Sequence, residues 1–347
     1  MLMRRLAGVL MVGLCAIGAS IASAQTPGPI EAIKSFSDFQ QVDVNRLLAG
    51  DILVQRGSLM SFPNGISGQT CFAVPLSAED TAKRLQTWDP LPHRELKVYA
   101  FHSLHAPCEA ADFAGLNFKS SEHSIRWLLD KTMATTASKS ELNLAKSEAG
   151  QLGSCPDKRS DQRKLAECWV RVLLDRATAF QQKGLAGVLP YEAAGYTASP
   201  ADQLRKMVSE QLPIAHEFFP LLKQIGLMGD EATPQIAPFY YWTLFDADHH
   251  GTISLGGVYL LAVGDHYQLA DVQYYVNANY FTSITLYEVW PIESAGKPAA
   301  LVWRADYFAA PMLAFTKGTE RIAYGALMMQ DIKKEIRYFE EDVKEKR

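Results

Sequence analysis

The pattern of hydrophobic and polar positions predicts three short strands near the start of the chain. Residues 70–76 and 96–104 alternate with a two-residue period, which is typical of half-buried strands, and residues 52–54 form a short apolar run after Gly50. Between the second and third stretches, Ser77 is followed three residues later by Asp80. That spacing marks the start of a helix, because the serine can cap its first turn.

The middle of the chain changes to a helical period. From about residue 120 to residue 229 the strand pattern is absent, and between residues 165 and 180 apolar side chains recur at three- and four-residue intervals. This spacing gives a helix one apolar face. The stretch Ser199-Pro200-Ala201-Asp202 predicts another helix start, with a capping serine and proline in the first turn. Residues 31–48 also predict a helix.

After residue 238 the strand pattern returns. Runs rich in Val, Ile, Tyr, Phe and Thr are separated by Asn, Gly and Pro, which favours an antiparallel sheet. The predicted strands cover residues 239–245, 252–263, 271–276, 280–290 and 299–308.

The last predicted element is a long helix over residues 317–344. Tyr324 and Met328 widen its apolar stripe, and the lysine of the pair Glu340 and Lys344 follows the glutamate by four positions, which stabilises a helix. The stripe itself comprises Ile322, Met329, Ile332, Ile336, Phe339 and Val343.

The order of elements is strands, a helical block, more strands and a long final helix. It predicts an α+β fold in which a curved antiparallel sheet is covered by the C-terminal helix. This order resembles that of START-like helix-grip domains, an analogy of element order alone. We expect one α+β domain over residues 25–347, with residues 120–230 as a mostly helical insertion or subdomain.

The first residues of the chain predict a signal peptide over residues 1–24. Arg4 and Arg5 precede an apolar run over residues 6–21, and Ala22-Ser23-Ala24 offers a small-x-small cleavage site. These three parts are typical of secretory signals, and the run is short for a membrane span, which needs about 20 residues. Cys15 raises the alternative of a lipoprotein signal, but Leu14 stands where that signal has a small residue. We therefore expect a periplasmic or secreted protein.

Composition narrows the class of protein. Hydrophobic residues make up 48% of the chain and charged residues 21%, with a formal net charge of −4. These values predict a globular protein with a substantial core and no electrostatic footprint for nucleic acid. The sequence has no motif for a metal or an organic cofactor, and we expect no membrane span in the mature chain.

The mature chain would keep four of the five cysteines, Cys71, Cys108, Cys155 and Cys168. An even number of cysteines in an oxidising compartment suggests disulfides. Four cysteines allow three pairings, of which we favour the pairs closest in sequence, Cys71 with Cys108 and Cys155 with Cys168. The alternative is that these residues are buried free thiols.

The stretch from Asp246 to Ser254 is the most motif-like in the chain. Asp246, Asp248 and Gly251 match the start of an EF-hand loop, but Gly257 stands where the bidentate glutamate belongs. A polar turn between two strands explains the same residues. A secreted hydrolase with a His/Asp site between residues 246 and 266 is an alternative, and it requires the turn to meet the loop at Asp265 and His266.

The strand over residues 299–308 contains Arg304 and Asp306, which alternation places on one face, with Trp303 on the other. In a cavity Arg304 could orient a carboxylate or phosphate, whereas on the outside the two would form a surface ion pair. Tyr274, Tyr280 and Tyr287 add rings with polar tips, which suit an amphipathic ligand. The favoured function is binding of an apolar or amphipathic small molecule between sheet and final helix, and a cell-envelope interaction protein is a further alternative.

We predict that the exported protein begins at Gln25, because the cleavage site ends at Ala24. The measurement is the intact mass of protein recovered from the exported fraction. A mass that includes Met1 would contradict the prediction.

Overall fold

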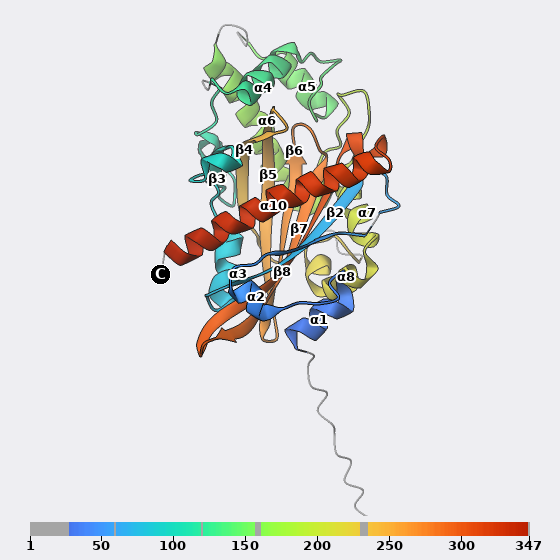
Figure 1. Cartoon of the computed structure of the whole chain (residues 1–347). Helices are drawn as coiled ribbons and strands as arrows, with labels where there is room; N and C mark the ends of the chain where they lie inside the picture. Colours follow the sequence, from blue (N-terminus) through green and yellow to red (C-terminus); the bar gives the residue numbers. More distant parts are fainter. Residues whose placement is uncertain (1–27, 59, 119–120, 157–160, 230–234, 346–347) are drawn as a thin grey trace, which may run out of the picture.

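The computed structural model describes residues 28–345 apart from residues 59, 119–120, 157–160 and 230–234. The signal peptide predicted at residues 1–24, and with it Cys15, lies outside the described residues. The fold is α+β, with a long helix at its C-terminal end (Figure 1).

Eight strands of the described chain form one curved antiparallel sheet that does not close into a barrel. Their order across the sheet is β1-β2-β8-β7-β6-β5-β4-β3, so the last strand lies beside the second. The strands are β1 (Leu53–Arg56), β2 (Gly65–Val74), β3 (Val98–Ser103), β4 (Phe239–Ala247), β5 (His250–Val263), β6 (His266–Val276), β7 (Thr282–Ser294) and β8 (Lys297–Ala309).

Tight turns join most of the strands from β4 to β8. The turn between β4 and β5 consists of Asp248 and His249, both with positive φ, and the turn between β7 and β8 consists of Ala295 and Gly296, also both positive. Two residues in this conformation form the turn that matches the natural twist of a hairpin. The stretch that resembles an EF-hand start is therefore a hairpin turn.

A block of helices covers one face of the sheet (Figure 1). Its core contains Trp169 and Phe180 from the helices and Trp242, Tyr274 and Trp303 from the strands. The helices in or beside this layer are α1 (Pro29–Phe36), α4 (His123–Ala134), α5 (Lys146–Gly153), α6 (Gln162–Lys183), α7 (Pro200–Ser209), α8 (Leu212–Glu217) and α9 (Phe219–Gln224). Elsewhere along the described chain, short 3-10 turns occur at η1 (Arg94–Leu96), η2 (Ala110–Phe113), η3 (Gly184–Gly187) and η4 (Pro311–Ala314).

The helix predicted over residues 31–48 is two helices. After α1 the chain is not helical until Asp43, whose side chain caps α2 (Val44–Leu48) by accepting hydrogen bonds from the Asn45 and Arg46 amides. An apolar spacing alone cannot show such an interruption, because Phe39 and Val42 are buried in the same core from non-helical backbone.

The other face of the sheet is covered by α3 (Ala78–Thr87) and by α10 (Thr319–Glu345), which crosses it diagonally (Figure 1). Ser77 caps α3 as predicted. Five predicted stripe residues of α10 are buried against the sheet, namely Met329, Ile332, Ile336, Phe339 and Val343. Ile322 is 49% exposed, so its predicted burial is wrong. The first turns of α10 lie beside the edge strand β1, where the sheet ends and no further strand of the described chain covers the side chain.

The disulfide between Cys155 and Cys168 is present, whereas Cys71 and Cys108 are free and buried. The predicted Cys71–Cys108 bridge is therefore wrong. Cys71 lies on β2, and Cys108 follows β3, which is six positions away in the strand order. Strands are spaced by about 4.8 Å, so the two strands are roughly 29 Å apart, whereas bridged Cα atoms lie within about 7 Å.

Among the described residues, no helix combines the length and apolarity that crossing a bilayer requires.

We predict that Ile336→Ala lowers the free energy of unfolding by about 2–5 kcal/mol, because it leaves a cavity in a packed core. Ile336 is 1% exposed at the α10–sheet contact. Leu327→Ala on the same helix is the matched control, because Leu327 is 57% exposed and should change stability by less than about 0.5 kcal/mol. Urea unfolding measures the free energy of unfolding of both variants. Equal losses in the two variants would contradict the packing described for α10.

Candidate functional site

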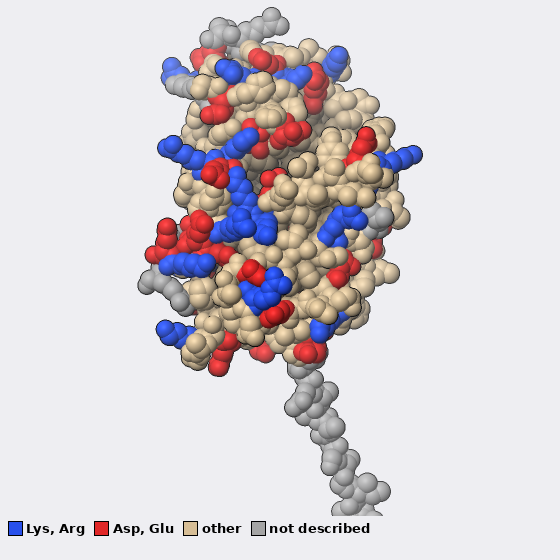
Figure 2. Space-filling model, viewed as in Figure 1, with Lys and Arg blue, Asp and Glu red and all other residues tan. Residues whose placement is uncertain are grey.

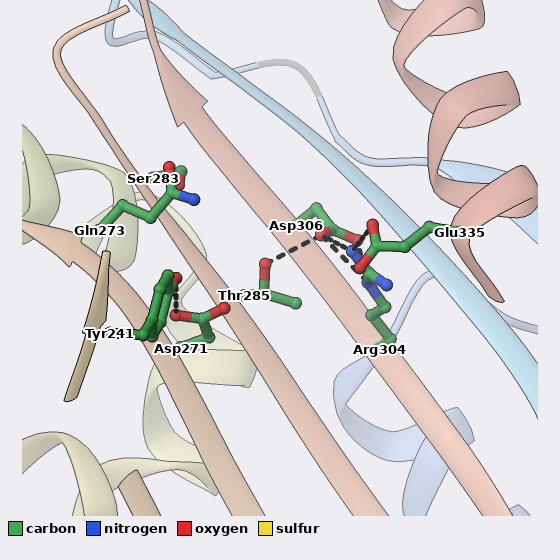
Figure 3. Close-up of polar contacts among 8 residues, drawn as sticks. All are labelled: Tyr241, Asp271, Gln273, Ser283, Thr285, Arg304, Asp306 and Glu335. Carbon is green, nitrogen blue, oxygen red and sulfur yellow. Dashed lines mark hydrogen bonds and ion pairs between the residues drawn. The ribbon is translucent and has the colours of Figure 1, made fainter. Parts of the chain in front are cut away.

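A row of polar side chains crosses the sheet face that α10 partly covers. Asp271 on β6 is paired in register with Thr285 on β7, which is paired with Asp306 on β8. Side chains of directly paired residues lie on the same face of a sheet, so these three residues are neighbours. Figure 3 shows Thr285 between the two aspartates.

Arg304 joins this row to α10. Its Nη2 donates hydrogen bonds to Asp306 Oδ1 at 2.7 Å and to Glu335 Oε2 at 3.0 Å, and its Nε donates to Asp306 Oδ2 at 2.9 Å (Figure 3). The Arg304 and Asp306 side chains are 7% and 1% exposed, so the surface-pair alternative is wrong. As predicted, they share a face and Trp303 lies on the other. Such buried charges require this pairing, because an isolated one is costly.

Tyr241 holds Asp271 from the opposite side. Its hydroxyl donates a hydrogen bond to Asp271 Oδ1 at 2.7 Å (Figure 3). The ring lies over Gly256 of β5, where an added Cβ would be 2.3 Å from it. A β-bulge occurs between Leu255 and Gly256. The glycine therefore provides the space in which Tyr241 reaches the carboxyl group.

Gln273 forms a second polar group in the same area. Its Oε1 accepts hydrogen bonds from the Tyr280 hydroxyl at 2.5 Å and from Ser283 Oγ at 3.1 Å. These contacts orient the amide, and a side-chain hydrogen bond also joins Gln273 to Tyr241.

We call this polar area of the sheet face the sheet recess, defined by Tyr241, Asp271, Gln273, Ser283 and Thr285. Asp271, Gln273 and Thr285 are only half-buried although they lie mid-sheet, on central strands. An apolar cluster that includes α10 and α3 lies on one side, and a second around Phe308 lies on the other. In Figure 2 this face is hollowed between α10 and the helices at the top of the view.

The surroundings of the sheet recess change the acidity of Asp271. Loss of hydration raises the pKa of its carboxyl group to about 7, and the nearby Glu335 and Asp306 charges act in the same direction. The Tyr241 hydrogen bond and the Arg304 charge oppose this rise, because both favour the carboxylate. Asp271 can therefore accept or donate a proton near neutral pH, a property common at functional sites.

The tyrosines predicted for a ligand site do not lie together. Tyr287 is buried beside α10, with the Arg304 guanidinium 5.3 Å from its ring centre. Tyr280 packs in the cluster around Phe308, at the edge of the sheet recess. Tyr274 lies on the opposite face, where its ring stacks at 3.7 Å on Phe180 of α6, so the alternation of β6 removes it from this site.

The two His/Asp loops lie far apart. The turn at Asp248 and His249 precedes β5, and Asp265 and His266 follow it. β5 has 14 residues, which at about 3.3 Å per residue separates its ends by roughly 40 Å. No group of three or more His, Cys, Asp or Glu side chains within the described ranges could hold a metal ion. The convergence on which the hydrolase alternative depends is therefore not present.

His266 has a different partner. Its Nε2 lies 3.0 Å from Glu288 Oε1, and the pair faces the helical block rather than α10. Hydrogen bonding to Glu288 raises the pKa of His266, while burial raises the pKa of Glu288. This buried pair forms no single site with the residues of the sheet recess, because they lie on opposite faces.

None of the five residues that define the sheet recess was among the predicted site residues, and neither was Glu335, although the sequence of β6 contains a signal. Leu269, Asp271 and Gln273 alternate with buried apolar residues, so one face of β6 changes from apolar to polar along the strand. Their meeting with Thr285 depends on the strand register, which a single sequence does not give.

Comparison with known proteins gives no family for this chain. No protein-family model matches it, and no curated protein matches it. Its function must be inferred from the geometry of the site.

We predict that Asp271 makes the stability of the protein fall as pH rises. Its pKa is about 7 in the folded state and ordinarily 3.8, so between about pH 4 and pH 7 the folded state binds more protons than the unfolded state. Asp271→Asn should remove this loss, which should be about 1–4 kcal/mol because the side chain is partly exposed and solvent screens its charge.

Urea unfolding at pH 5, 6, 7 and 8 measures this effect. The advantage of Asp271→Asn over the wild type should grow with pH, and Asp175→Asn on the exposed side of α6 is the control. Parallel pH profiles for wild type and Asp271→Asn would contradict the raised pKa.

Proposed function

We propose that this chain is an exported protein that binds an amphipathic small molecule in the sheet recess. The observation that carries the proposal is the row of half-buried polar side chains in the middle of the sheet face, with a carboxyl group whose pKa is about 7. Polar groups in such a place cost stability unless they have partners. Tyr241, Tyr280 and Ser283 supply some of these partners, and a ligand with a few hydrogen-bonding groups would add others.

The polar end of the ligand should carry hydrogen-bond donors. Asp271, Asp306 and Glu335 place three carboxyl groups on this face, and Arg304 offsets only part of their charge. An amine would pair with ionised Asp271, and a hydroxyl would donate to its free oxygen or to Thr285. A carboxylate ligand would be repelled by the same groups.

The apolar part of the ligand would lie along the rings beside the polar row. Tyr280 and Phe308 border the sheet recess on one side, and Tyr241 and Phe101 stack with ring centres 5.6 Å apart on the other. Beneath α10 the described side chains pack into an apolar cluster. The proposed binding site is therefore beside the final helix, and not the predicted cavity beneath it.

Melting curves with dodecylamine, dodecanol and dodecanoate, each below its micelle concentration, test the proposal at pH 8. A ligand that binds the folded state at ten times its Kd adds about 1.4 kcal/mol, which for a chain of this size raises Tm by roughly 2 °C. We expect the amine to raise Tm most and the carboxylate least, because Asp271 is mainly ionised at this pH.

Two variants distinguish binding in the sheet recess from binding elsewhere on the protein. Asp271→Asn should abolish the preference for the amine, and Thr285→Val should reduce the Tm shift that the alcohol causes. Asp175→Asn should behave like the wild type. No shift with any of the three ligands, or the same shifts in all variants, would contradict the proposal.

A further inference from the structure

The edge strand β1 has a free side. Within the part of the chain that the structure describes, it pairs with β2 alone. The Gly57 amide donates a hydrogen bond to the Ser67 carbonyl of the neighbouring strand. Because antiparallel pairs alternate between hydrogen-bonded and non-hydrogen-bonded positions, the N–H and C=O groups of Val54 and Arg56 point away from β2. They can accept another strand.

A groove of about 840 Å³ runs between this free edge and α10. Gly325 lets the Arg56 side chain pack closely against the helix, because an added Cβ would lie 3.2 Å from it. The groove is lined by Asp38, Val54, Gln55, Arg56, Gly57, Ser58, Ile322, Gly325, Ala326, Met329, Gln330 and Lys333.

The available charge in the groove is basic. Arg56 and Lys333 line it, and Lys333 also lines a smaller adjoining hollow of about 150 Å³ together with Arg337. None of these three side chains has an ion-pair partner among the described residues. Figure 2 shows Lys and Arg side chains gathered over the middle of α10.

The acidic residues at the groove are already engaged. Asp38 accepts hydrogen bonds from Ser58 and from Gln69, and Asp51 pairs with Arg46 at 2.7 Å. Their charges are therefore less available to an incoming ligand than those of the basic side chains. An anionic ligand complements the remaining charge.

The groove also has an apolar end. Val54 is 37% exposed and Ile322 is 49% exposed, and both line the groove together with Ala326. An extended strand presents alternate side chains to one face. One apolar side chain of an extended peptide could thus contact Val54 or Ile322 while acidic side chains two residues apart reach Arg56 and Lys333.

We propose that β1 and α10 form a binding groove for an extended acidic peptide of a partner protein, which adds to β1 as a ninth strand. Main-chain hydrogen bonds to Val54 and Arg56 would fix the backbone, and the groove would select side chains, as in other cases of strand addition. A second copy of this chain is disfavoured as the occupant, because pairing β1 with β1 brings like charges of Arg56 together.

A random-peptide library displayed on phage tests this proposal with the full chain. Selection on the wild type should enrich peptides that carry Asp or Glu at alternate positions. Parallel selection on the double variant Arg56→Glu/Lys333→Glu should not enrich such acidic peptides. Peptides enriched on the wild type should bind this variant at least about tenfold more weakly than the wild type in fluorescence anisotropy. Lys344→Glu, an exposed change near the end of α10, is the matched control. Absence of acidic enrichment, or the same enrichment on both proteins, would overturn the proposal.

Amide hydrogen exchange distinguishes strand addition from simple charge pairing. An enriched peptide should slow exchange of the Val54 and Arg56 amides, and a proline at its centre should remove both binding and protection. Binding that leaves these amides unprotected would overturn the strand-addition model. A wild-type dimer that Val54→Pro dissociates would overturn it too, because the edge would then serve a second copy.

Discussion

The strict alternation of side chains along β8 is the constraint on which this structure depends. Trp303 and Tyr307 lie in the core beneath the helical block, while Arg304 and Asp306 face α10. One strand therefore supplies large apolar side chains to one layer and a buried ion pair to the other. A shift of one residue in its pairing would reverse both faces, burying the charges among the aromatic rings.

The ion pair in turn positions the final helix. Glu335 of α10 contacts Arg304 near the middle of the sheet, and at the far end Asp342 accepts a hydrogen bond from Trp88 Nε1 at 2.7 Å. Apolar residues between these points fill the contact with the sheet. The diagonal path of α10 leaves two open regions beside it. The sheet recess is acidic and the groove at β1 is basic, so they suit ligands of opposite charge.

Local pattern was enough to predict much of the fold. The α+β class, the antiparallel sheet, the long final helix and the helical middle all follow from hydrophobic periods of two and 3.6 residues. Contacts between distant segments were not predictable in this way. Cys71 lies on β2 and Cys108 follows β3, and these two strands are near opposite edges of the sheet. Asp271 meets Thr285 and Tyr241 only through strand register and a bulge at Gly256. Of the predicted ligand residues, Arg304 and Asp306 do share a face, whereas Tyr274 faces the helical block.

The central claim is that the sheet recess is a binding site and not only a structural polar cluster. The most direct measurement is a crystal structure of the protein purified, without unfolding, from the cells that produce it. The account predicts electron density of an organic molecule within hydrogen-bond distance of Asp271, with its apolar part against Tyr280 and Phe308. A recess that contains only water bonded to Asp271, Gln273 and Thr285, in crystals of protein that also fails to bind amphipathic amines, would contradict it.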